Sequence, residues 1–168
     1  MMKVLIISDS HGRAKRLNEI VDRVKADHVI HCGDFCTGRS ELPSVPLTVV
    51  RGNCDWEEVS EEEVFEADSL RFFVTHGHRY RVKESLLPVK YRAQEAGAQI
   101  ACFGHSHFPV CEEEDGVLLI NPGSITQPRG FTVPTYAVLE KKDGKIKVVF
   151  YQTDGTPITE RGFEGELS

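Results

Sequence analysis

The sequence has no long apolar run. None of its 168 residues lies in a stretch that approaches the roughly 18 consecutive apolar residues of a membrane-spanning helix. The apolar run Val4–Ile7 is too short for the core of a signal peptide and lacks a small-residue cleavage site after it. We therefore expect no membrane association and a cytoplasmic location, with Val4–Ile7 inside a first buried strand.

The sequence also lacks an excess of basic residues. Lys and Arg number 20 against 26 Asp and Glu, and the formal net charge is −6. Proteins that bind nucleic acids generally present a basic face, so we expect no general nucleic-acid binding. This charge does not count bound metal ions, and it leaves room for a local positive site made by them.

The five cysteines do not form the pairs that mark a disulfide framework or a zinc site. Cys32 and Cys36 are spaced C-x3-C, but no second pair completes a site and no C-x-x-C motif occurs. Their number is odd, and structural disulfides are unusual in a reducing compartment. We therefore interpret most of them as buried free thiols and give little weight to a redox or zinc function.

Linkers, long repeats and low-complexity segments are absent as well. The 168 residues are a normal size for one domain, and 40% hydrophobic and 27% charged residues are typical of a globular chain. We therefore expect a single domain over residues 1–168.

Short apolar runs alternate with helical patterns in the first two-thirds of the chain, and hairpins follow. Apolar residues at helical spacing predict helices over 14–26 and 85–96. Asp-Gly turns predict hairpins over 109–121 and 136–152. Further strands are predicted over 3–8, 28–31, 47–51, 64–67, 70–75 and 99–103. This order indicates a mixed α/β sandwich with sheet in the middle and helices outside.

Five of the predicted strands are each followed by a polar cluster that contains residues able to bind a metal. Ligand sites in open α/β sheets form at the carboxyl ends of strands, so we expect these clusters to meet at one edge of the sheet. Glycines in or beside them let a loop approach a ligand closely. The clusters are Asp9-Ser10-His11-Gly12, Gly33-Asp34, Gly52-Asn53, His76-Gly77-His78 and Gly104-His105-Ser106-His107.

Each cluster alone is a weak signal, because such short motifs are more often solvated turns or exposed strand ends. Together they are informative. Five of the seven histidines lie in three of the clusters, where random placement would scatter them. The set therefore indicates a functional site.

The donor atoms favour transition metals. Imidazole and carboxylate ligands without thiolates suit Mn, Fe, Zn, Co or Ni better than Ca or Mg. A single zinc site uses about three or four ligands. The six or seven candidates here suit two ions that share one carboxylate, roughly 3.5–4 Å apart.

In this order, the clusters D-x-H, G-D, G-N, a histidine after a strand and G-H-x-H resemble the signature of the calcineurin-like metallophosphoesterases. The length, the G-N-C-D motif at 52–55 and the segment Asn121-Pro122-Gly123-Ser124 are similar to the small single-domain bacterial and archaeal phosphodiesterases of that family. The resemblance covers the chain to about residue 150.

The resemblance implies a four-layer αββα sandwich and a site for two metal ions. One ion would be held by Asp9, His11, Asp34 and His107. The other would be held by Asp34, Asn53, His76 and His105, with Asp34 as the bridge.

The implied activity is hydrolysis of a small phosphodiester by a hydroxide that bridges two divalent transition metals. Manganese is favoured, with Fe, Ni, Co and Zn as alternatives. Two ions would bring a charge of about +4 and Asp9 and Asp34 about −2, so the site would stay positive and attract phosphate. Neutral Asn53 preserves that charge, since a third carboxylate would cancel much of it.

Cys54 is a departure from the larger family members, many of which have a histidine after this asparagine to assist the leaving group. A thiol is a weak donor with an ordinary pKa near 8.5, so the usual general acid is missing. We predict slower turnover and a preference for good leaving groups. Asp55 is an alternative acid, although a turn carboxylate that faces water is the simpler interpretation.

Ser124 and Arg129 lie in a glycine- and proline-rich segment and are candidates for substrate contact. His78 is expected beside a ligand or in solvent, His31 in the core and His28 exposed. Outside catalysis as a phosphodiesterase, two alternatives stay open. They are a phosphomonoesterase on the same site and a non-catalytic protein-binding scaffold of the same fold. The natural substrate, the native metal and the oligomeric state stay open as well.

Overall fold

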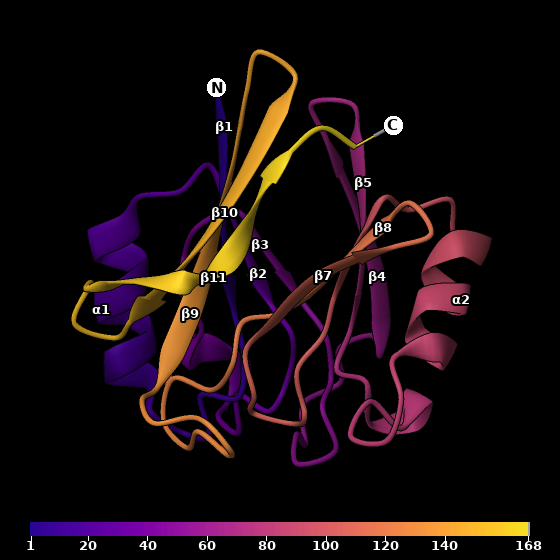
Figure 1. Ribbon diagram of the computed structural model, residues 1–168. Coiled ribbons are helices and arrows are strands. Elements are labelled where there is room, and N and C mark those ends of the chain that lie inside the picture. The colour runs from indigo at the N-terminus through magenta and orange to yellow at the C-terminus, as the bar shows by residue number, and fades with distance from the viewer. Residues whose placement is uncertain (168) are drawn as a thin grey trace.

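The computed structural model, which describes residues 1–167, contains two β-sheets packed face to face with an α-helix against each outer face (Figure 1). This is the expected four-layer αββα arrangement. The prediction that the five polar clusters meet at the edge of one sheet was wrong in this respect, because they follow strands of both sheets.

The first sheet has six strands in the order β11-β10-β9-β1-β2-β3. Strands β1 to β3 are parallel, whereas β9, β10 and β11 continue the sheet in antiparallel pairs. The bounds are β1 Met2–Ile7, β2 His28–His31, β3 Leu47–Val49, β9 Thr135–Lys142, β10 Lys145–Gln152 and β11 Pro157–Gly165.

The second sheet has five strands in the order β4-β5-β6-β8-β7. Strands β5, β6 and β8 are parallel, and the hairpin partners β4 and β7 form the two edges. The bounds are β4 Glu62–Ala67, β5 Leu70–Thr75, β6 Ile100–Cys102, β7 Val110–Glu114 and β8 Val117–Asn121.

Both helices lie on outer faces because each has an apolar side. Helix α1 (Ala14–Val24) buries Leu17, Ile20 and Val21 in a cluster with Leu5 of β1. The shorter helix α2 (Leu87–Glu95) buries Val89 and Ala93 in a cluster with Phe73 and Leu119 of the second sheet. Two single-turn 3₁₀ segments occupy Arg39–Glu41 and His78–Tyr80.

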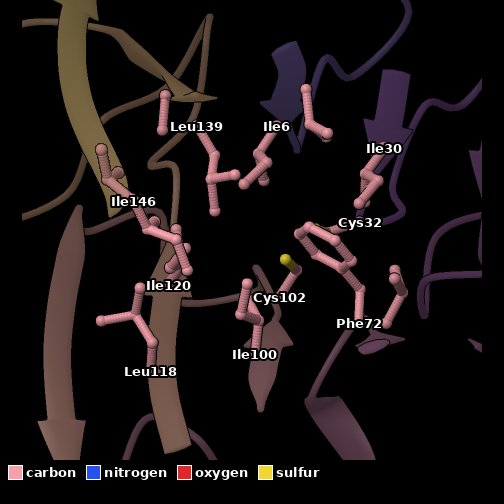
Figure 2. Close-up of a cluster of buried hydrophobic side chains, with 14 of the residues drawn as sticks. Ile6, Ile30, Cys32, Phe72, Ile100, Cys102, Leu118, Ile120, Leu139 and Ile146 are labelled. Carbon is pink, nitrogen blue, oxygen red and sulfur yellow. The ribbon is translucent and has the colours of Figure 1, made fainter. Parts of the chain in front are cut away.

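The main core fills the space between the sheets (Figure 2). Ile6 and Ile30 point into it from the first sheet, and Phe72, Ile100 and Ile120 from the second. The central strands are covered on both faces, which is why they appear in the sequence as continuous apolar runs. This core fixes the two sets of strand ends relative to one another.

The cysteines of the described residues are free thiols, as predicted, but only two of the five are buried, whereas most were expected to be. Cys32 and Cys102 are buried in the core between the sheets, Cys36 and Cys111 are partly buried, and Cys54 is exposed. In the same part of the chain, no helix is long and apolar enough to cross a membrane.

Most predicted elements are present with bounds shifted by a few residues. Strand β11 is the main omission. Its sequence contains a proline, two glycines and several charged residues, none of which favours a strand. Pairing with β10 at the sheet edge stabilises it regardless of this composition.

Candidate metal centre

The loops after β1, β2, β3, β5 and β6 meet at one end of the sandwich, the lower end in Figure 1. Backbone hydrogen bonds join them: Asp9 N–H donates to the Gly33 carbonyl, and His11 N–H to the Asp34 carbonyl. Across the sheet, Gly104 N–H donates to the His76 carbonyl. The predicted clusters are therefore neighbours in space.

Asp9 lies at the middle of this group and is fully buried. Its Oδ1 atom is 3.1 Å from Nε2 of His76, 3.2 Å from Nε2 of His107 and 3.6 Å from Nε2 of His11. One carboxylate oxygen thus faces imidazole nitrogens from three different loops.

Asp34 adds a second buried carboxylate. Its Oδ2 atom is 3.3 Å from Nε2 of His76 and 3.9 Å from Nε2 of His11. Two compact ligand groups result, Asp9–His11–His107 and Asp9–Asp34–His76, each with its ligand atoms within 4.8 Å of one another.

His105 and Asn53 lie at the margin of these groups. The ring centre of half-buried His105 is 5.1 Å from that of His76, and the backbone N–H of His105 donates to Asp9 Oδ2 at 3.2 Å. Asn53 is exposed, and its side-chain amide lies 3.7 Å from Cys54 Sγ. The structure thus brings six of the seven predicted ligands together and leaves Asn53 facing solvent beside them.

Two motif glycines make room for the carboxylates. A Cβ on Gly52 would lie 2.1 Å from Asp34 Oδ1 and 2.6 Å from the Asp34 backbone nitrogen. A Cβ on Gly104 would lie 2.6 Å from Asp9 Oδ2. All three distances are shorter than any normal contact of a Cβ atom. The glycine of G-N therefore clears space for Asp34, not only for Asn53 as the sequence suggests.

A family model described as the calcineurin-like phosphoesterase superfamily domain matches residues 2–144. The chain belongs to this superfamily. It is 44% identical over 160 residues to the probable metallophosphoesterase YsnB of Bacillus subtilis, covering 94% of this chain and 95% of that protein. It is 32% identical to the phosphodiesterase MJ0936 of Methanocaldococcus jannaschii, covering 84% of this chain and 96% of the relative.

Solved structures agree with this assignment. A predicted phosphoesterase from Streptococcus pneumoniae superposes with a TM-score of 0.86 at 34% identity, covering 97% of this chain and 96% of that chain. Chaetomium thermophilum Vps29 shares the fold, with a TM-score of 0.79 at 20% identity over 100% of both chains. The chain is a metallophosphoesterase by family.

The donor set fits a divalent cation, as membership of a metallophosphoesterase family implies. Nδ1 of His107 lies 2.6 Å from the Gln127 carbonyl oxygen, which can only accept, so Nδ1 carries the hydrogen. In the neutral ring, the Nε2 lone pair then faces Asp9 Oδ1, another acceptor, at 3.2 Å. Two facing acceptors need a proton or a cation between them, and a histidine oriented by its second nitrogen is typical of metal ligands.

Five ligand residues of this phosphoesterase have left-handed backbone conformations. Such φ angles are uncommon outside glycine, cost about 1–3 kcal/mol each and cluster at functional sites. The five are Asp9 (φ 53°), His11 (42°), Asp34 (59°), His105 (69°) and His107 (62°). These strained backbone conformations direct the side chains of the loops toward the centre of the candidate site, and they cost conformational energy.

The surroundings of Asp9 keep its carboxylate anionic. Burial alone would raise the pKa of Asp9, but hydrogen bonds with His107, His11 and His76 lower it well below its ordinary value. The bond to Asp9 raises the pKa of His11, while the positive charge of Arg129 opposes that rise. Burial and the neighbouring His76 lower the pKa of His105 to about 4, so its ring is neutral and able to donate a lone pair at neutral pH.

Asp55 differs from the prediction of a carboxylate that faces water. It is buried and accepts three backbone hydrogen bonds at 2.7–2.8 Å, from the N–H groups of Asp34, Gly52 and Cys36. These bonds fasten the Asp34 loop to the Asn53 loop. Asp55 therefore positions Asp34 and the loop that carries Asn53. Its place three residues after Gly52, in a tight turn, is the sequence feature that points to this buried role.

Ser124 also differs from the prediction. It is fully buried, donates its hydroxyl hydrogen to the Asp9 carbonyl and accepts from Thr126 N–H and Gln127 N–H, so it faces backbone and not a substrate. Arg129 is exposed, and its backbone nitrogen lies 3.5 Å from the His107 carbonyl oxygen.

The remaining histidines support the loops. His31 is buried as predicted and accepts from Gly33 N–H at 3.0 Å, with Ser10 Oγ 2.9 Å from its other nitrogen. His78 lies beside a ligand, with its Nδ1 3.1 Å from Nδ1 of His76. His28 is not exposed as expected, since it stacks on Phe65 of the other sheet at 3.8 Å.

Proposed function

We propose that this chain is a phosphodiesterase that hydrolyses a small phosphodiester at a centre of two divalent transition metal ions. The main support is the pair of compact ligand groups at the strand ends, Asp9–His11–His107 and Asp9–Asp34–His76. The curated relative MJ0936 carries the name phosphodiesterase, which favours diesters over monoesters.

In this proposal one ion is held by Asp9, His11, Asp34 and His107, and the other by Asp34, Asn53, His76 and His105. A bridging role for Asp34 is supported by its Oδ2 atom, which lies near His76 of one set and His11 of the other, at 3.3 Å and 3.9 Å. Manganese is the favoured ion, and Fe, Ni, Co or Zn suit the same donors.

When bound, the ions supply Lewis-acid chemistry that neutralises phosphoryl oxygens and activates water for attack on phosphorus. The protein residues have three tasks. The histidines direct ring nitrogens toward the two carboxylates, the glycines leave room for those carboxylates, and Arg129 meets the phosphate from the exposed side. Because two aspartates offset only part of the charge of two divalent ions, the site attracts anionic substrates.

Asp34→Asn tests the proposal. Asparagine tolerates the left-handed backbone at position 34, so the variant removes charge without added strain. We expect at least a hundredfold lower kcat/KM and lower metal content, because the bridge is lost. Elemental analysis and assays of aryl phosphodiesters and monoesters with each metal provide the measurement.

Asp143→Asn is the matched control, since Asp143 is exposed, lies in the β9–β10 turn and also has positive φ. Near-normal turnover in Asp34→Asn would refute the bridging role. Faster hydrolysis of monoesters than of diesters would favour the phosphomonoesterase alternative. A protein that binds no metal and hydrolyses no ester under any of these conditions would favour the protein-binding scaffold.

A further inference from the structure

Arg161 of β11 lies outside residues 2–144, the part of the chain that the family model matches. Its guanidinium carbon is 4.8 Å from the ring centre of Phe108 and 5.1 Å from that of Phe131. The two rings pack edge to face, with centres 5.9 Å apart and planes at 85°. We call these three residues the arginine–phenylalanine stack.

The stack joins three segments that are far apart in the sequence. Phe108 directly follows His107 after β6, Phe131 lies in the loop between β8 and β9, and Arg161 lies in the edge strand of the first sheet. Arg161 Nη1–H also donates to the Pro109 carbonyl at 3.0 Å. A cation over two rings with a further hydrogen bond holds these segments in one arrangement.

The loop held by the stack is the one that carries Arg129. Gly130 packs on the Phe108 ring so closely that a Cβ there would lie 3.2 Å from Cδ2. Arg129 N–H lies 3.5 Å from the His107 carbonyl oxygen, and the Gln127 carbonyl accepts from His107 Nδ1. Residues 127–131 therefore lie between the metal centre and the stack.

We propose that Arg161 is a positioning residue for substrate binding, which holds residues 127–131 through Phe108 and Phe131 so that Arg129 points to the substrate phosphate. The inference rests on the proposed function, because a phosphoester is the ligand that gives Arg129 its role. It adds a contribution from β11, far in sequence from every metal ligand.

Arg161→Ala, Arg161→Lys and Arg129→Ala, compared with wild type, test the proposal. With an aryl phosphodiester and Mn²⁺, we expect Arg161→Ala to raise KM about tenfold and change kcat by less than about twofold, since binding and not chemistry is affected. Metal content should stay the same. Arg161→Lys, which keeps a cation over the rings, should recover part of the loss.

The double variant Arg161→Ala/Arg129→Ala decides whether Arg161 acts through Arg129. Its KM should match that of Arg129→Ala alone, because residues that act through one another are not additive. Additive effects, or a fall in kcat with unchanged KM, would overturn the positioning role.

Hydrogen exchange of the metal-loaded protein gives a readout that needs no substrate. The backbone amides of Gln127, Arg129, Gly130 and Phe131 should exchange faster in Arg161→Ala, whereas exchange elsewhere should not change. Arg23→Ala is the control, because Arg23 also donates to a backbone carbonyl, that of Thr153, away from this loop. If wild type hydrolyses no phosphoester, the proposed function fails, and unchanged exchange in Arg161→Ala would separately show that the stack does not hold the loop.

Discussion

Cys54 occupies the position beside Asn53 where many larger family members have a histidine. It is exposed, and its backbone N–H donates to Asp34 Oδ1 at 2.9 Å. Its partial burial and the nearby Asp34 carboxylate raise the pKa of the thiol, so it stays protonated at neutral pH. The protonated thiol of Cys54 is thus poorly suited to nucleophilic attack, and the Cys54 backbone helps to orient Asp34.

Cys54→His should therefore speed the hydrolysis of poor leaving groups more than that of good ones. A histidine can donate a proton to the leaving oxygen, and general-acid help is worth about 10²–10⁴-fold at its best. Rates for alkyl and activated aryl phosphodiesters, compared between the two proteins, provide the measurement. Equal rates for the two ester classes in wild type would contradict the premise.

His31 gives the apo-protein a predictable pH dependence. Burial lowers its pKa from 6.5 to about 4, so the unfolded chain binds a proton between these values that the folded chain does not. The contribution of His31 to the free energy of unfolding should be complete above pH 6.5. It should fall by roughly 3 kcal/mol as the pH drops toward 4. Urea unfolding with a chelator present should show this fall in wild type.

His31→Gln separates this contribution from those of other histidines, which titrate in both proteins. The stability difference between wild type and variant should shrink as the pH falls from 6.5 to 4. A difference that does not vary with pH would show that His31 does not carry the effect.

At the scale of the elements, the loops at the strand ends are built around close backbone approach. Gly52 allows the β3 loop to contact Asp34 in the β2 loop, and Asp55 fastens both. A side chain at Gly52 cannot be accommodated by a rotamer change alone, because part of the clash is with the Asp34 backbone nitrogen.

Gly52→Ala should accordingly lower metal affinity and kcat/KM by about 10–100-fold, as loss of support behind metal ligands generally does. Gly38→Ala is the matched control, since Gly38 has an ordinary φ of −68° and a Cβ there would meet nothing closer than 3.8 Å. Metal titration followed by fluorescence of the single tryptophan, exposed Trp56 near Asn53, measures the affinity. Equal affinities in the two variants would contradict the steric argument.

At the level of the whole molecule, the candidate metal ligands follow strands of both sheets. Asp9, His11 and Asp34 follow strands of the first sheet, whereas His76, His105 and His107 follow strands of the second. A bound ion therefore links the two halves of the sandwich in the folded state and has no equivalent site in the unfolded chain.

Metal should consequently stabilise the fold. At a free metal concentration 100 times Kd, the gain is about 2.7 kcal/mol per site, and Tm should rise by roughly 5–10 °C for each occupied site over the chelated protein. Asp9→Asn, which removes a proposed ligand of one ion, should reduce the shift, while Asp143→Asn should retain it in full. Thermal unfolding with and without Mn²⁺ measures it, and an equal shift in Asp9→Asn would exclude Asp9 from the site.

The types of the candidate ligand residues and their order along the chain are predictable from the amino-acid sequence. Strands covered on both faces must be apolar, so polar residues with metal-binding groups are concentrated where the strands end. This pattern can be recognised in the amino-acid sequence. The helices and most strands were predictable for the same reason, because periodicity records which side of each segment is buried.

The pairing of the strands and the surroundings of the candidate metal ligands are known only from the folded structure. That Asp55 is buried under three N–H groups and that β11 brings Arg161 to Phe108 both depend on contacts between distant residues. The charged, glycine-containing sequence of β11 does not favour a strand, and Asp55 resembles any turn carboxylate. Local sequence does not encode such features, because their energies arise from partners that only the folded chain brings within reach.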